Sequence, residues 1–256
     1  MGQRVTWETA SAIAIGTSHI ERGGVCQDRC SAKVVHQGAR PWLAMFVADG
    51  AGSASHSDVG AQMAIDIAND FVLQLMADSE FGLNDALAVE VVREIRSAIY
   101  ATAEEEGRTA RDYACTFLGL LSSELGTLVF QIGDGAVVLD AGQGLELAIT
   151  PQNGEFANMT FFITDENALD TLVTKLYAGP ALQAAAFSDG VQRLALDMAS
   201  NTPHKPFFAP FFNVLATVTA EARDQIPGAL AAFLSSDKVN SRTDDDKSMA
   251  LAVLRA

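Results

Sequence analysis

Cysteine is scarce in this chain, and its apolar runs are short. The 256 residues include three cysteines, Cys26, Cys30 and Cys115, an odd number that is too small for a disulfide framework. We therefore expect reduced thiols in a cytoplasmic protein. The most apolar stretch, FFAPFFNVLATV, is too short to cross a membrane and contains a proline. The beginning of the chain, MGQRVTWETASA, lacks the apolar segment of a signal peptide.

Positive charge is also in short supply. The chain has 17 basic and 32 acidic residues, which gives a formal net charge of −15. This balance argues against nucleic acid or an anionic membrane as a partner. Hydrophobic residues make up 49% of the chain, enough for a globular protein with a sizeable core. We expect a monomer.

The motifs of several common catalytic and metal sites are missing. There are four histidines and no G-x-S-x-G motif, so Ser-His-Asp catalysis is not favoured. A phosphate-binding P-loop is absent as well. Cys26 and Cys30 have a spacing that could suit a metal, but no second Cys/His pair stands nearby. Structural cysteines are therefore the better interpretation.

Short apolar runs typical of β-strands are what the sequence does contain. Turn residues bound them, and the predicted strands are 10–16, 42–48, 115–121, 127–133, 136–141, 159–164, 182–187 and 249–254. Helical spacing predicts helices over 57–78 and 85–107, and a further helix over 219–235 that is interrupted near Pro227. Regular β-α-β alternation is absent, which favours layered antiparallel sheets with helices packed on them over a parallel doubly wound sheet.

Aspartates stand at the ends of these predicted strands. The dipeptides Asp49-Gly50, Asp134-Gly135 and Asp189-Gly190 each end a strand, the triplet 244–246 precedes the last strand, and Asp28 precedes another apolar run. One such aspartate is most simply a turn residue. Their repetition predicts that several carboxylates converge. Converging carboxylates repel one another and raise each other's pKa, a cost that a cation removes.

The residue types indicate which cation this would be. Oxygen ligands without paired histidines or cysteines favour Mg²⁺, Mn²⁺ or Ca²⁺, and the alternating acids of a calcium loop are absent. Four or five separate aspartates are more than one Mg²⁺ or Mn²⁺ needs, so the sequence predicts a two-metal site. Two ions roughly 4 Å apart can clamp a phosphate and activate a bridging water.

The ordered motifs GTSH…CQDR, FVADGAGS, CTFLGLL…QIGDG, FSDG and DDKSMALAVL resemble the metal-dependent type-2C Ser/Thr protein phosphatases, in their compact bacterial branch. The resemblance runs over essentially the whole chain, and it lies in the order of the motifs rather than in any one of them. It implies a single catalytic domain over residues 1–256, built as a four-layer α-β-β-α sandwich of two antiparallel sheets flanked by helices. It also implies metals at one end, between the sheets, and a flap within 150–181 that shapes substrate access.

The resemblance further implies the ligands of two Mn²⁺ or Mg²⁺ ions. Asp49 would bridge both ions, and the Gly50 carbonyl would serve the first. Asp189 and Asp245 would hold the second ion. Asp134, together with Asp189, would help to hold a third and weaker ion.

Around these ligands the resemblance implies a catalytic role for Asp28, which would orient a metal-bound water. Three positions depart from the family, and one of them is Ala51, which stands where some members have a histidine. Gln27 replaces a glutamate, and Gly23 stands where an arginine often binds the substrate phosphate. The candidates to replace that arginine are His19, Arg22 and Arg29, with His19 favoured.

The function expected from these residues is Mn²⁺- or Mg²⁺-dependent hydrolysis of phosphoserine and phosphothreonine in proteins, by a water that the two metals activate. The partners would be a phosphorylated protein substrate and a cognate Ser/Thr kinase. Two alternatives stay open. One is a phosphatase of small phosphoesters. The other is a catalytically degenerate domain that binds or senses phosphoproteins, an alternative that the missing glutamate and arginine motivate.

Overall fold

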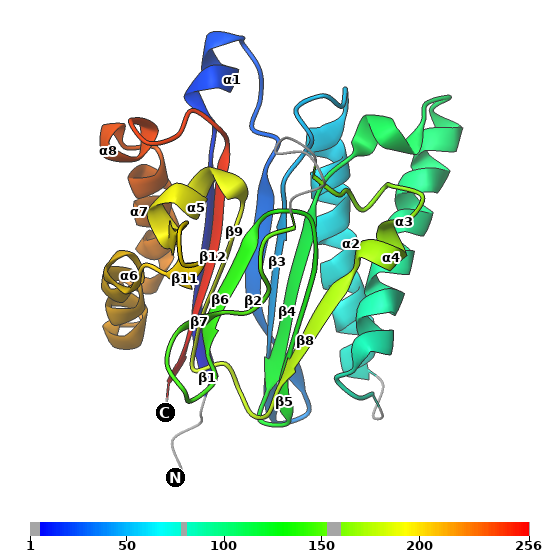
Figure 1. Ribbon diagram of the computed structural model, residues 1–256. Helices are drawn as coiled ribbons and strands as arrows, with labels where there is room; N and C mark the ends of the chain where they lie inside the picture. Colours follow the sequence, from blue (N-terminus) through cyan, green and yellow to red (C-terminus); the bar gives the residue numbers. More distant parts are fainter. Residues whose placement is uncertain (1–5, 78–80, 153–159, 256) are drawn as a thin grey trace.

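Two five-stranded antiparallel sheets pack face to face in the computed structural model, which describes residues 6–77, 81–152 and 160–255 (Figure 1). The first sheet has the strand order β1 (Thr6–Ala14), β12 (Lys247–Arg255), β9 (Gln183–Phe187), β6 (Ala136–Asp140) and β7 (Glu146–Leu147). The second has the order β2 (Arg29–Gln37), β3 (Arg40–Ala48), β4 (Phe117–Ser123), β5 (Gly126–Ile132) and β8 (Val173–Tyr177).

Helices cover the outer face of each sheet (Figure 1). The second sheet is covered by α2 (Ser57–Ala77) and α3 (Asp85–Glu105), and the first by α5 (Asp189–Ala195), α6 (Lys205–Thr217) and α7 (Ile226–Leu234). The short α8 (Asp237–Asn240) lies beside α7. The shorter elements are α1 (Thr17–Glu21), η1 (Ala110–Tyr113), α4 (Ala168–Thr171), β10 (Leu196–Asp197), β11 (Thr202–Pro203) and η2 (Arg223–Gln225). This is the predicted α-β-β-α arrangement. No helix among the described residues combines the length and the apolar character needed to cross a membrane.

Burial on both faces explains the apolar character of the central strands. In β3, Ala44, Phe46 and Ala48 belong to the core beneath α2 and α3, whereas Leu43, Met45 and Val47 belong to the core between the sheets. Successive side chains of a strand point to opposite faces. A strand that lies between two cores therefore reads as a continuous apolar run rather than as an alternating one.

The two long predicted helices are confirmed, because one apolar stripe faces the sheet. In α3 the buried residues include Leu87, Val91, Ile95 and Ile99, four positions apart. The helix begins where the Asn84 side chain accepts a hydrogen bond from the Leu87 N–H at 3.0 Å, a typical N-cap.

Two sequence predictions of secondary structure were wrong, and other elements were not predicted. In its described part, the strand predicted over 159–164 is a single bridge residue, Thr160, followed by loop and turn at 161–164. Pro227 does not interrupt a helix over 219–235 but lies in the first turn of α7, where a missing N–H costs nothing. Helix α6 and strand β8 were not predicted, because uniformly apolar or short segments carry no clear period. Residues 153–159 of the expected flap lie outside the described residues.

Candidate metal centre

The loops at one end of the sandwich enclose a cavity of about 190 Å³. Four of the predicted aspartates, Asp49, Asp134, Asp189 and Asp245, line it together with Gly50. The other lining residues are His19, Gln27, Ala51, Gly52, Thr116, Thr160, Phe162 and Asp246. The antiparallel topology produces this convergence, because β3, β5 and β9 end, and β12 begins, at the same edge.

Asp49 is fixed by the neighbouring strand. Its N–H donates to Thr116 Oγ1 at 3.0 Å, and the Thr116 N–H donates to the Asp49 carbonyl at 2.8 Å. The next residue, Gly50, forms a bridge with Cys115. A Cβ atom on Gly50 would lie 2.8 Å from the carbonyl oxygen of Gln27, so glycine lets the segment before β2 come close to the end of β3.

A second close approach brings Asp189 beside the loop that precedes β12. Asp189 is the first residue of α5, and a Cβ atom on the following Gly190 would lie only 1.9 Å from the Asp246 carbonyl oxygen. Only glycine fits there. On the other side of this loop the buried Lys247 donates to the Asp245 carbonyl at 3.0 Å and to Asn240 Oδ1 at 3.1 Å.

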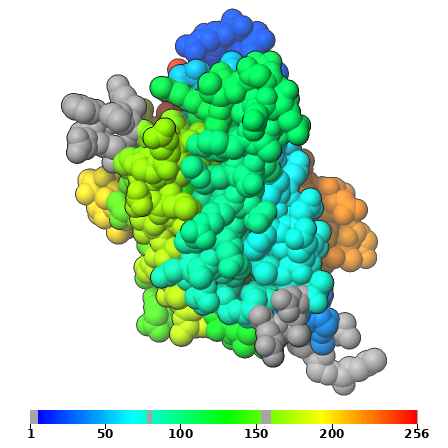
Figure 2. All heavy atoms as spheres, turned by 90° about the vertical axis from the view of Figure 1, so that its right-hand side faces the viewer, coloured from blue at the N-terminus to red at the C-terminus, as the bar shows by residue number. Residues whose placement is uncertain are grey.

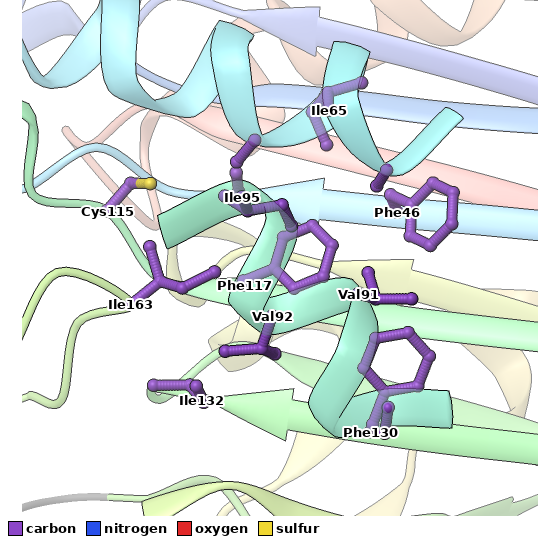
Figure 3. Packing of buried hydrophobic residues seen from close by; sticks show 14 of the residues in the cluster. Phe46, Ile65, Val91, Val92, Ile95, Cys115, Phe117, Phe130, Ile132 and Ile163 are labelled. Carbon is purple, nitrogen blue, oxygen red and sulfur yellow. The ribbon is translucent and has the colours of Figure 1, made fainter. Parts of the chain in front are cut away.

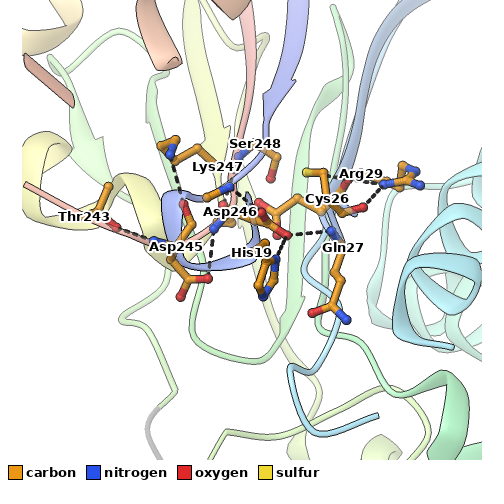
Figure 4. Close-up of polar contacts among 12 residues, drawn as sticks. His19, Cys26, Gln27, Arg29, Thr243, Asp245, Asp246, Lys247 and Ser248 are labelled. Atoms are coloured by element: carbon orange, nitrogen blue, oxygen red, sulfur yellow. Dashed lines mark hydrogen bonds and ion pairs between the residues drawn. The ribbon is translucent and has the colours of Figure 1, made fainter. Parts of the chain in front are cut away.

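Asp246 also lines the cavity, although the sequence reasoning treated it only as the rest of a pattern. Its carboxylate is 3% exposed and accepts hydrogen bonds from the N–H groups of Gly16 and Gln27, both at 2.6 Å (Figure 4). It also contacts His19 Nδ1 at 2.8 Å. Asp246 thereby joins the loop after β1 to the segment before β2 and holds His19 at the cavity wall.

The protein phosphatase 2C family matches this chain over residues 15–235. The chain belongs to this family. It is 51% identical over 250 residues to Serine/threonine-protein phosphatase 3 of Escherichia coli (strain K12), which covers 97% of this chain and 99% of that relative. The predicted family, fold and enzyme class are confirmed.

Solved structures of this phosphatase family share the fold. The catalytic domain of PstP in complex with two manganese ions has a TM-score of 0.62 at 17% identity, over 98% of this chain and 100% of that one. Stp1 from Staphylococcus aureus has a TM-score of 0.61 at 12% identity, over 96% of this chain and 94% of that one.

The acids of this phosphatase perturb one another. Burial, followed by the charges of Asp28, Asp189 and Asp245, raises the pKa of Asp49 well above its ordinary value. Burial, followed by Asp134 and Asp245, raises the pKa of Asp189 to about 6. Asp134 also has a raised pKa because of burial, which the Thr160 hydroxyl opposes.

Asp28 is fully buried and is not part of the cavity wall. Burial raises its pKa to about 7. The hydroxyls of Ser188 and Ser248 lie close enough to oppose that rise, but among the described residues neither carboxylate oxygen of Asp28 has a partner in hydrogen-bonding geometry.

The donor set fits a hydrated divalent cation. One oxygen of Asp189 is also buried without a partner in the described part of the chain, and the carboxylates that share the cavity keep their charge only at a cost that a cation would remove. Within residues 6–77, 81–152 and 160–255, no three acid, histidine or cysteine side chains already close around one point. Mg²⁺ and Mn²⁺ sites that keep several waters do not need such a cage.

The candidate phosphate-binding residues differ in their placement. His19 lines the cavity, whereas Arg22 is exposed and is not among the lining residues. The sequence reasoning missed two other arginines. Arg193 and Arg242 line a second cavity of about 190 Å³ whose walls include Asp189 and Asp245. Neither arginine forms an ion pair with any described residue.

Proposed function

We propose that this protein is a Mn²⁺- or Mg²⁺-dependent serine/threonine protein phosphatase in which Asp49, Asp134, Asp189 and Asp245 hold the ions. The observation that carries the proposal is the convergence of these aspartates, from four separate loops, on one cavity. Raised pKa values at Asp49, Asp134 and Asp189 support it. So do the name of the 51% identical relative, a serine/threonine-protein phosphatase, and the two manganese ions of PstP.

Bound divalent ions would neutralise the charge of the substrate phosphate and lower the pKa of the attacking water. The protein's own residues prepare the site. Thr116 fixes the backbone of Asp49 through two hydrogen bonds. Asp28 lies behind the cavity wall, and its two oxygens, which have no partners in the described structure, would orient a water that reaches it. A carboxylate only accepts, so Asp246 holds the Nδ1–H of His19 and leaves Nε2 as the ring's other polar atom for the phosphate.

The test is turnover of p-nitrophenyl phosphate and of a phosphothreonine peptide by the metal-free protein, with and without MnCl₂. We expect turnover only with the metal, its loss in EDTA, and a loss of at least about 100-fold in Asp49→Asn, given that one transition-state contact contributes a factor of about 10²–10³. Asp70→Asn, on the exposed side of α2, is the matched control and should keep full activity.

Full activity of Asp49→Asn, or in EDTA, would refute the proposal. Binding of the phosphopeptide without turnover at saturating Mn²⁺ would favour a degenerate binding domain, and turnover of small phosphoesters alone would favour a metabolite phosphatase. Several expectations stay predictions from the sequence. They are the single catalytic domain with its flap, the third ion, the cognate kinase, the cytoplasmic location, the monomeric state and the lack of nucleic-acid and membrane partners.

A further inference from the structure

Two side chains of helix α3 bind backbone carbonyls of a loop at the edge of the cavity. Arg96 Nη1 donates to the carbonyls of Ile163 and Asp165, the latter at 2.6 Å. One turn later in the helix, the Tyr100 hydroxyl donates to the Thr164 carbonyl at 2.9 Å. The Arg96 guanidinium also lies 5.2 Å from the centre of the Tyr100 ring. Two side chains thus bind three consecutive carbonyls, and we call this contact the α3 clamp.

In the α3 clamp, the charged Arg96 side chain binds carbonyl oxygens and, among the described residues, no carboxylate. Arg96 has no ion pair with any residue in the described part of the chain. Hydrogen bonds from a charged donor are stronger than neutral ones, and the planar guanidinium can reach two carbonyls without reorganising. An arginine in this position is therefore suited to fixing the conformation of a loop.

The clamped loop is anchored on its inner side as well. The Ile163 N–H donates to the Cys115 carbonyl at 2.8 Å, and the Ile163 side chain is fully buried in the same core as Ile95 and Cys115 (Figure 3). The Phe162 N–H donates to Asp165 Oδ2 at 2.8 Å. Seen from the helical face, the yellow-green segment that contains this loop lies directly beside α3 (Figure 2).

The loop presents two side chains to the cavity. Phe162 and Thr160 both line it, and the Thr160 hydroxyl donates a hydrogen bond to Asp134 Oδ2. Asp134 is one of the aspartates proposed to hold a metal ion. A donor that touches a ligating carboxylate fixes its orientation, and loss of such a partner typically costs about 10–100-fold in metal affinity or activity.

We propose that Arg96 is a positioning residue for the metal centre: the α3 clamp places Thr160 against Asp134 and sets the orientation of that carboxylate. The part of this inference that concerns metal rests on the proposed function. Arg96 acts on Asp134 only through the clamped loop. A surface helix on the far side of the sheet thereby controls the occupancy of the site to which Asp134 contributes.

The experiment compares four variants of the full chain with the wild type. Thr160→Val removes the hydroxyl, and Thr160→Ser retains it. Arg96→Met removes the clamp, and Arg93→Met, at an exposed position on the same helix, is its matched control. Two readouts are used: binding of MnCl₂ to the metal-free protein by isothermal titration calorimetry, and amide hydrogen exchange of residues 160–172 without metal.

We expect Thr160→Val to weaken the lowest-affinity Mn²⁺ site about 10-fold without faster exchange, and Thr160→Ser to bind within about twofold of the wild type. Arg96→Met should weaken the same site and also exchange faster at Phe162 and Ile163. Arg93→Met should change neither readout. Since Thr160→Val leaves the clamp intact, unchanged Mn²⁺ binding in that variant would overturn the inference even if Arg96→Met fails to fold.

Unchanged Mn²⁺ binding in Thr160→Val would overturn the inference. So would unchanged exchange in Arg96→Met, or faster exchange in that variant with unchanged Mn²⁺ binding. A wild type that binds no Mn²⁺ would instead refute the proposed function. In that case the exchange comparison of Arg96→Met with Arg93→Met still decides whether α3 fixes the loop.

Discussion

Replacing Asp28 by asparagine should stabilise the metal-free protein while reducing its activity. Asp28 is fully buried, and burial raises its pKa from 3.8 to about 7. A carboxylate at this position is therefore ionised at pH 8 against the preference of its surroundings. Asparagine has nearly the same shape and no charge, so it removes this cost without leaving a cavity.

The magnitude follows from the pKa. At 1.36 kcal/mol per pH unit, a rise from 3.8 to about 7 costs the folded state about 4 kcal/mol above pH 7. The buried amide of the asparagine lacks good hydrogen-bond partners, which costs about 1–3 kcal/mol and reduces that gain. The net stabilisation is then about 2 kcal/mol, which corresponds to a Tm about 4–8 °C higher for a protein of this size.

The pH dependence independently tests the sign of the predicted change in stability. Between pH 4 and 7 the folded protein binds more protons at Asp28 than the unfolded chain does, so the stability of the wild type falls as pH rises through this window. The advantage of Asp28→Asn should therefore be largest above pH 7 and shrink as pH falls towards the unfolded pKa of 3.8.

Thermal unfolding in EDTA at several pH values between 4 and 8 measures this effect, with Asp70→Asn as a control that should stay within about 1 °C, as surface substitutions usually do. A Tm that falls in Asp28→Asn at pH 8, or a gain that is the same at pH 4 and pH 8, would refute the reasoning. Turnover with MnCl₂ should fall in the same variant, because Asp28 no longer orients the water.

Three further predictions concern the rest of the site. Gly190→Ala should lower the free energy of unfolding by more than about 2 kcal/mol in urea titrations. Its Cβ would lie 1.9 Å from a backbone oxygen of Asp246, and overpacking typically costs about 1–3 kcal/mol. An unchanged urea midpoint would contradict this prediction. The double variant Arg193→Gln, Arg242→Gln should raise KM for an acidic phosphopeptide several-fold and leave turnover of p-nitrophenyl phosphate unchanged, whereas equal effects on both substrates would count against a peptide contact. His19→Ala should raise KM for both substrates about 10-fold, as expected for loss of a hydrogen bond to a charged group, and an unaltered KM would remove His19 from the phosphate site.

The features that the sequence predicts well are those that depend on residues close together in the chain. The stripe Leu87, Val91, Ile95 and Ile99 depends only on helical spacing. The Asp-Gly pairs at strand ends can likewise be recognised from neighbouring residues. The antiparallel arrangement is enough to bring Asp49, Asp134 and Asp189 to one edge. Short strands such as β8 and the uniformly apolar α6 carry no such period, and packing alone decides their conformation.

The supports of the site could not be predicted, because each joins a side chain to a distant segment. Asp246 accepts from the N–H of Gly16, 230 positions away, and Arg96 donates to a carbonyl 69 positions along the chain. A backbone donor or acceptor has no residue identity, so no pairing of residue types reveals such a contact. For Asp246 a weak signal exists: three consecutive acids in an extended segment cannot all face the same side, so one of them must have another role.

Gln27 shows how a departure from the family can suit the charge balance of this site. It lines the cavity, its N–H donates to Asp246 at 2.6 Å, and its Oε1 is buried without a partner among the described residues. A glutamate there would add another buried negative charge to carboxylates whose pKa values are already raised by burial and by one another. Glutamine keeps an oxygen directed into the same space and avoids that cost in the metal-free protein. The backbone contact to Asp246 is independent of the side chain, so the substitution changes the charge of the cavity and leaves its framework in place.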